Sequence, residues 1–574
     1  MIVNNVIKPW GRILLISFAA LPGFIRGIHA QQLEARTYAV ELTAEVQENP
    51  AEIVLKWRGD AYARNYTINR KLRQENQWTR IGTAAGHESW FIDRNVSVGQ
   101  GYEYQVVKEG TLDYTGYGYI YAGIQVPLVE DRGRIILLVE ESVLDALAFE
   151  LDRLELDLIG DGWRVVRRSV ARTATPVQAK EVVGSAYSED PSNTHALLLF
   201  GNIPVPYSGN FMPDHHADHT GAWPADVYYA DVDGAWTDSE LSWKAVGDRQ
   251  DNYPGDGRFD QNSPPSRLEL QLGRVDLSRL TCFLNKTPSR NEVDLLRGYL
   301  EKNHAFRHGK LPTEARGLVF DQIGSKKPEW MSTMAWRNFA PFVGGGIDVV
   351  GPNEYLPAVT SKNYLWTSVV AGGNFTHADG VGSADAFAFH SVNAVFTMFC
   401  GSYYGDWDVE SNFLRAALGG NGRVLAALYS GQPQWSCHTM ALGESIGAAA
   451  KITQENAEQG LYPPHLHGAG QVHIALLGDP TVRAHPVAPP PLTDKPHRRG
   501  SCEDESHGPD RKQNGAELDT PDDRLPPLEP MPRRRIVIDG PWMLLRTEVE
   551  FRLVRCRFRV VERRHLHGPK RRDH

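Results

Sequence analysis

Between residues 130 and 487 the chain alternates short apolar runs with amphipathic segments, and this pattern limits the possible folds more than any other feature. Apolar runs such as GRIILLVEE and THALLLFGN are typical of buried strands. The segments VLDALAFELDRLELDLI and PVQAKEVVGSAY place apolar residues at three- and four-residue spacing, as do helices that cover a sheet. Strands that alternate with helices predict βαβ units, so we expect a large α/β domain with a mainly parallel sheet.

Residues 36–126 have a different pattern, in which short segments alternate apolar and polar residues and are separated by turn residues. EIVLKW, NYTINRKL, QWTRIG, WFIDRNV and GYEYQVVK are the clearest of these segments. Short strands at this spacing predict an antiparallel all-β sandwich. With Trp57 at the end of one strand and Tyr104 in a late one, the segment resembles a fibronectin type III domain. The resemblance implies a spacer or binding module without chemistry of its own.

The two ends of the chain differ from both of these regions. Residues 1–30 combine Lys8 and Arg12 with the apolar run ILLISFAALPGFI, which is typical of an export signal and too short for a membrane span. We therefore expect a secreted or cell-envelope protein without a membrane span. Residues 488–574 are rich in proline and charge, which predicts a linker or a disordered tail. The abrupt change in composition also suggests that this tail is translated out of frame.

Charge and motifs exclude several classes of function. The chain has 61 Lys and Arg against 70 Asp and Glu, a net charge of −9, which is unlike the basic surface of a nucleic-acid binder. The sequence has no GxGxxG that follows a strand and no GxxxxGK[ST], so nucleotide-dependent chemistry is not expected. We therefore expect the chain to act on protein or peptide substrates or to bind extracellular protein partners.

Three landmarks in the α/β region occur in an informative order. Leu272–Asp276 reads LGRVD before an expected helix, the apolar run SVNAVFTMF leads into Cys400, and Leu476–Arg483 reads LLGDPTVR. In this order the landmarks resemble those of the gingipain-like cysteine peptidases, whose α/β fold is caspase-like. The resemblance implies two lobes, at about 130–276 and 277–487, and a nucleophile at the end of the strand before Cys400.

Chemistry of this kind needs a thiolate and a nearby imidazole, because histidine takes the thiol proton and later protonates the leaving amine. Cys400 and His377 are the candidate pair, and the resemblance implies a cysteine-type endopeptidase that uses this dyad. Backbone N–H groups near Gly401 would then stabilise the oxyanion. His390 is a third candidate base, although its apolar surroundings favour a core position.

Two alternatives stay open at these positions. The family carries Cys-x-Asn-Gly-Asp, and alignment on Gly405–Asp406 places Ser402 rather than Cys400 at the nucleophile position. Alignment of LWTSVVAGG with the histidine strand of the family places Ala371 or Gly372 where the imidazole belongs. The first alignment removes the thiol and the second removes the imidazole, and the alternative function is that of a catalytically inactive adhesion or scaffold protein.

Two polar segments could bind metal ions. Acidic loops suit hard cations, and gingipain-like domains carry structural calcium, so we expect calcium at four aspartates: Asp226, Asp231, Asp233 and Asp238. The segment PDHHADH holds three histidines, of which His215 and His219 would face one way in a helix. Proline and glycine around it disfavour a helix, so a transition-metal site is not favoured there.

Overall fold

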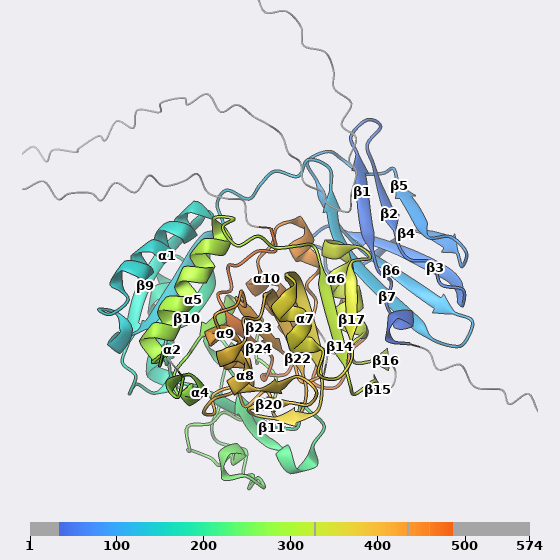
Figure 1. The fold of residues 1–574 in the computed structure, drawn as a ribbon. Helices are drawn as coiled ribbons and strands as arrows, with labels where there is room; N and C mark the ends of the chain where they lie inside the picture. The colour runs from blue at the N-terminus through green and yellow to red at the C-terminus, as the bar shows by residue number, and fades with distance from the viewer. Residues whose placement is uncertain (1–33, 287, 327–328, 433–434, 458–459, 486–574) are drawn as a thin grey trace, which may run out of the picture.

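The computed structural model describes residues 34–286, 288–326, 329–432, 435–457 and 460–485. The expected export signal at 1–30 and the expected tail at 488–574 lie outside these residues. Within the described ranges, every helix is too short or too polar to cross a membrane. The described residues form a small β-sandwich that packs against one side of a larger α/β domain (Figure 1).

The sandwich has two antiparallel sheets, as the alternating pattern predicts. One sheet has the order β1-β2-β5 and the other β4-β3-β6-β7. The strands are β1 Thr43–Gln47, β2 Glu52–Lys56, β3 Ala63–Lys71, β4 Thr79–Ala85, β5 Trp90–Asp93, β6 Gly101–Gly110 and β7 Thr115–Gly123. Apolar residues from both sheets, with Trp57, Tyr66 and Tyr104 among them, form a separate buried cluster. The sandwich thus has a hydrophobic core of its own.

A ten-stranded sheet forms the centre of the α/β domain, with the order β17-β14-β18-β22-β23-β24-β13-β10-β8-β9. Neighbours from β17 to β23 are parallel, and so are neighbours from β13 to β9, whereas β24 runs antiparallel to β23. The strands are β8 Gly133–Glu140, β9 Trp163–Val170, β10 Thr194–Phe200, β13 Gln271–Val275, β14 Gly317–Asp321, β17 Ile347–Val350, β18 Tyr364–Val370, β22 Ala394–Cys400, β23 Ala426–Tyr429 and β24 Ala475–Gly478. The predicted mainly parallel α/β sheet is confirmed.

Helices cover both faces of this sheet because its strands are apolar on both sides. In β8, Ile135, Leu137 and Val139 pack in one cluster with α1 and α5, whereas Ile136 and Leu138 pack in a second cluster with α2. The helices are α1 Ala148–Gly160, α2 Pro176–Ser188, α3 Val227–Ala230, α4 Thr281–Leu284, α5 Glu292–Arg307, α6 Thr333–Val343, α7 Tyr355–Ser361, α8 Ala384–Phe389, α9 Phe413–Gly419 and α10 Ile446–Glu455.

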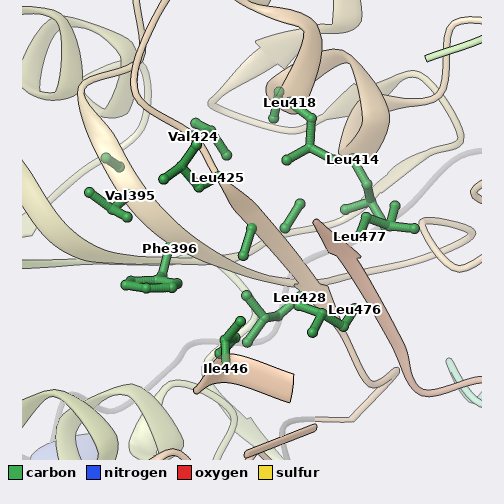
Figure 2. Close-up of a cluster of buried hydrophobic side chains, with 14 of the residues drawn as sticks. Val395, Phe396, Leu414, Leu418, Val424, Leu425, Leu428, Ile446, Leu476 and Leu477 are labelled. Carbon is green, nitrogen blue, oxygen red and sulfur yellow. The ribbon is translucent and has the colours of Figure 1, made fainter. Parts of the chain in front are cut away.

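The strand that ends at Cys400 lies in the middle of this packing. Figure 2 shows Leu414 and Leu418 of α9 on one side of the neighbouring strands and Ile446 of α10 on the other. The leucines and the isoleucine are fully or almost fully buried. Close packing on both faces fixes the end of β22, and with it the loop that follows.

Helix α1 begins later than the sequence pattern predicts. The apolar spacing predicts a helix from Val143, but α1 begins at Ala148 and a 3₁₀ turn occupies Glu141–Val143. In that turn the Glu140 carboxylate accepts a hydrogen bond from the Ser142 N–H at 2.7 Å. This side-chain bond satisfies a backbone donor without a helix, which explains the later start.

A buried carboxylate joins the sandwich to the α/β domain. Glu103 of β6 is fully buried and accepts hydrogen bonds from Lys71 Nζ at 2.9 Å and Tyr462 Oη at 2.7 Å. The His438 ring lies 3.0 Å from the same carboxylate, through Nε2, and Arg73 lies 3.5 Å from it. Tyr462 and His438 belong to the α/β domain, so the two domains share one ionic cluster.

Candidate active site

The carboxyl end of β22 meets the loop that joins β11 and β12. The hairpin of β11 (Tyr207–Phe211) and β12 (Gly221–Pro224) carries the PDHHADH segment in its connecting loop. Residues 401–412 follow β22 and end at Asn412, whose Oδ1 accepts the Leu414 N–H at 2.9 Å and so caps α9. Side chains from these two loops form the candidate active site.

One contact between the loops joins a hydroxyl to an imidazole. His216 Nε2 lies 2.7 Å from Ser402 Oγ, and both side chains are half-buried. The His216 ring stacks on Tyr403, with ring centres 5.4 Å apart. Tyr403 has φ of 64°, a left-handed conformation that costs free energy for a residue with a Cβ and that often occurs at functional sites. Ser402 therefore lies on a sharp turn directly after the strand.

A second histidine of the segment is held by two carboxylates. His219 is buried, and its Nδ1 lies 2.9 Å from Asp214 while its Nε2 lies 2.7 Å from Asp406. Burial lowers the pKa of His219, but the hydrogen bonds and charges of the two carboxylates outweigh it, so the net shift is upward. Both ring nitrogens are occupied, which leaves His219 no free nitrogen for proton transfer.

Asp214 connects this buried ion pair to the hydroxyl and imidazole. Its carboxylate accepts the Tyr403 N–H at 2.9 Å and the His216 N–H at 3.3 Å, in addition to the His219 contact. Burial raises the pKa of Asp214, but the hydrogen bond and charge of His219 outweigh it and the net pKa is lowered. Asp214 is therefore anionic at neutral pH, and it positions both sides of the Ser402–His216 contact.

Further polar groups anchor the loop after β22. Asp406 accepts hydrogen bonds from Gln250 Nε2 at 3.0 and 3.1 Å, and Tyr207 Oη donates to Asp408 at 2.8 Å. Arg249 contacts both carboxylates. Because the partners lie more than 150 residues away in the sequence, they tie the loop to the segment 207–250.

Cys400 and His377 have other neighbours. Cys400 is 5% exposed, and its Sγ lies 2.9 Å from the Gly431 carbonyl oxygen and 3.9 Å from Met331 Sδ. His377 lies in the short strand β20 (His377–Ala378), has 43% of its side chain exposed and pairs with Asp379 at 3.4 Å. His390 is exposed and follows α8 instead of lying in the core. Catalysis by Cys400 and His377 stays a prediction.

The four aspartates expected to bind calcium do not come together at one site. Asp226 is buried in a bidentate ion pair with Arg274, at 2.7 and 2.8 Å, which does not fit a cation site. Asp238 accepts the N–H groups of Gly255 and Gly257. Asp231 and Asp233 do come together with Glu269, with carboxylate oxygens within 4.8 Å of one another. Only this part of the expected set fits a hard cation, and calcium there stays a prediction.

His216 is not among the bases that the sequence suggests. Its partner lies 186 residues further along the chain, and no spacing rule joins positions so far apart. A usable signal was present in the three histidines within six residues of PDHHADH, which the sequence suggested only as an unfavoured metal site. Ser402 was the alternative nucleophile that alignment on Gly405–Asp406 suggested, and its role stays a prediction.

Comparisons with known proteins find only distant similarity to solved structures. No family model matches this chain, and no curated protein matches it. Among solved structures, the Arg-specific cysteine proteinase gingipain R is similar over 62% of this chain and 80% of its own, with 13% identity and a TM-score of 0.37. A Fn3-like protein from Clostridium thermocellum is similar over 16% of this chain and 91% of its own, with 21% identity and a TM-score of 0.13. These values are too low to support an inference about activity.

Proposed function

We propose that this chain is a hydrolase of peptide or related acyl bonds that uses Ser402 as nucleophile and His216 as general base. The observation that carries the proposal is the 2.7 Å contact between His216 Nε2 and Ser402 Oγ at the carboxyl end of a central strand. Parallel sheets bind their ligands at this edge. A hydroxyl needs an adjacent base to act as nucleophile near neutral pH, and this distance meets that requirement.

In the proposed reaction, Ser402 Oγ attacks the carbonyl carbon while its proton passes to His216 Nε2. The imidazolium then gives this proton to the leaving amine or alcohol as the acyl–serine ester forms. Water attacks the ester with His216 again as base, which releases the acid and restores the serine. Asp214 is a positioning residue in this scheme, because it holds the His216 backbone and the turn at Tyr403.

The surroundings of Cys400 favour Ser402 over a thiol nucleophile. A thiol 2.9 Å from a carbonyl oxygen is stabilised as S–H, because a thiolate there would face the negative end of the C=O dipole. Reactive cysteines are partly exposed in electropositive surroundings, whereas Cys400 is 5% exposed. Cysteine-type hydrolysis by Cys400 and His377 therefore needs a rearrangement that the Ser402 mechanism does not need.

A second candidate function is a catalytically inactive scaffold, and one contact favours it. The Tyr403 N–H, next to the proposed nucleophile, donates to Asp214 at 2.9 Å. In many serine hydrolases the N–H after the nucleophile stabilises the oxyanion, so here that role falls to N–H groups next to Gly401. An exported location and protein partners belong to both candidate functions and are proposals from the sequence.

Hydrolysis of a fluorogenic peptide and ester library by four single variants tests the proposal. We expect His216→Gln to reduce the rate by about 10² to 10⁴, the usual contribution of a general base, and Ser402→Ala to reduce it by at least as much, because it removes the nucleophile. Cys400→Ala should keep the rate. His215→Gln is the matched control, because it makes the same change one residue away at a ring that packs on His467.

Each contrary result has a definite meaning. Loss of hydrolysis in Cys400→Ala with an active Ser402→Ala would restore the thiol mechanism. Folded protein that hydrolyses no member of the library would favour the scaffold. Circular dichroism of every variant separates a lost side chain from a lost fold.

A further inference from the structure

A cluster of two histidines and one aspartate lies away from the candidate active site. Asp157 belongs to α1, His304 to the last turn of α5, and His308 follows α5 directly. The two histidines are four residues apart, so a helix brings them to the same side. Ring centres 4.2 Å apart show that they do lie together.

The polar atoms of the three side chains converge. His304 Nδ1 lies 2.8 Å from one oxygen of Asp157, and His308 Nε2 lies 2.8 Å from the other. One candidate ligand atom from each residue lies within 4.8 Å of the other two. Tetrahedral zinc with bonds of about 2.1 Å separates its ligands by roughly 3.3 Å, so the nitrogens and the carboxylate would move apart by only about 0.5 Å.

Burial and charge also suit a cation. The Asp157 side chain is 2% exposed, and those of His304 and His308 are 19% and 10% exposed, so the cluster is shielded but open on one side. The nearby cation, Arg307, already pairs with Asp161 and with Asp479. The charge of Arg307 is therefore balanced by Asp161 and Asp479. The side-chain partners of the Asp157 carboxylate are the two imidazoles.

We propose that Asp157, His304 and His308 bind one first-row transition-metal cation, with Zn²⁺ the best match. Two imidazole nitrogens and one carboxylate oxygen are ligands that zinc takes readily, whereas calcium and magnesium select oxygen alone. Three protein ligands leave the fourth position on the open side to water. Since α1 belongs to the first lobe and α5 to the second, the ion would link the two lobes.

The fate of the two imidazole protons on metal binding depends on the charge of each ring. Three bonds form, from the metal to His304 Nδ1, His308 Nε2 and an oxygen of Asp157. Each imidazole gives up the proton that faces the carboxylate. In a neutral ring the other nitrogen takes up a proton, and in a cationic ring the proton passes to solvent. The ligands of an unfolded chain are dispersed, so the folded protein gains stability from the ion.

Calorimetric titration of the metal-stripped full chain with ZnCl₂ tests the proposal. We expect one equivalent to bind to the wild-type protein and to be lost in Asp157→Asn, His304→Gln and His308→Gln. The exposed His87 in the sandwich provides the matched control His87→Gln, which should bind as the wild type does. Thermal unfolding in EDTA establishes that each variant is folded before titration.

A second readout does not depend on the variants. ZnCl₂ should raise the unfolding temperature of the wild-type protein, whereas MgCl₂ at the same concentration should not. No zinc uptake by the wild-type protein would overturn the proposal. Uptake that persists in all three variants and is lost in His467→Gln would also overturn it, because the ion would then occupy the histidines near the active-site loop.

Discussion

Replacement of Glu103 by glutamine should destabilise the junction between the sandwich and the α/β domain. The side chain keeps its size and loses its charge, which leaves Lys71 buried without its carboxylate partner. Burial alone would raise the pKa of Glu103, but His438, Arg73 and Lys71 lower it to about 2, from an ordinary value of 4.5. This difference corresponds to about 3 kcal/mol of stabilisation of the folded state.

Loss of one partner of a buried ion pair costs about 3 to 5 kcal/mol in other proteins, which agrees with the value from the pKa. We therefore expect Glu103→Gln to lower the free energy of unfolding by about 3 kcal/mol at pH 7. Urea unfolding followed by tryptophan fluorescence measures it, because Trp78 lies 5.4 Å from Lys71 Nζ in the same cluster. Glu45→Gln is the matched control.

The control removes the charge of an exposed carboxylate in place of a buried one. The Lys56–Glu45 pair lies in the same domain, with 46% and 67% of its side chains exposed, and such pairs contribute at most about 1 kcal/mol. Equal effects of Glu103→Gln and Glu45→Gln would refute the reasoning.

The dependence on pH gives an independent check. Because the folded-state pKa is depressed, the contribution of Glu103 is complete above about pH 4.5 and is lost as the pH falls toward 2. The difference in stability between wild type and variant should therefore narrow over this range.

Three further predictions concern single side chains. Iodoacetamide should alkylate Cys400 far more slowly in native protein than in urea, because the thiol is buried, and rapid native alkylation mapped by mass spectrometry would contradict this. Asp479→Asn should lower the free energy of unfolding in urea by roughly 3 kcal/mol, because it weakens the 2.7 Å ion pair with buried Arg307. A decrease below about 1 kcal/mol would contradict this contribution of the ion pair. Because the pKa of His219 is raised, its protonated ring stabilises the folded state below the ordinary pKa of 6.5, and this stabilisation is lost as the pH rises through the raised value. The unfolding temperature of the wild-type protein should therefore fall at alkaline pH, and that of His219→Gln should not show this fall.

The sequence predicted the α/β fold well because the relevant signals are local. Apolar runs such as Ile135–Val139 must be buried on both faces, and the structure places this run in β8, between β10 and β9, with apolar clusters on both faces. The end of the strand at Cys400 was also predicted, since the apolar run stops there. Both inferences use neighbouring residues alone.

Side-chain partners at the site could not be predicted in the same way. Asp226 looks like a cation ligand in the sequence, but Arg274, 48 residues away, neutralises it. His216 meets Ser402 only because the hairpin of β11 and β12 reaches the end of β22. Such pairings depend on how segments far apart in the sequence pack together, and local periodicity carries no information about that packing.

The most direct test of the proposed chemistry is the position of a covalent adduct. Native protein treated with a fluorophosphonate probe, digested and mapped by mass spectrometry should carry the label on Ser402, and His216→Gln should slow this labelling while His215→Gln should not. A label on another residue, or equal labelling of Ser402 in the native and His216→Gln proteins, would contradict the account.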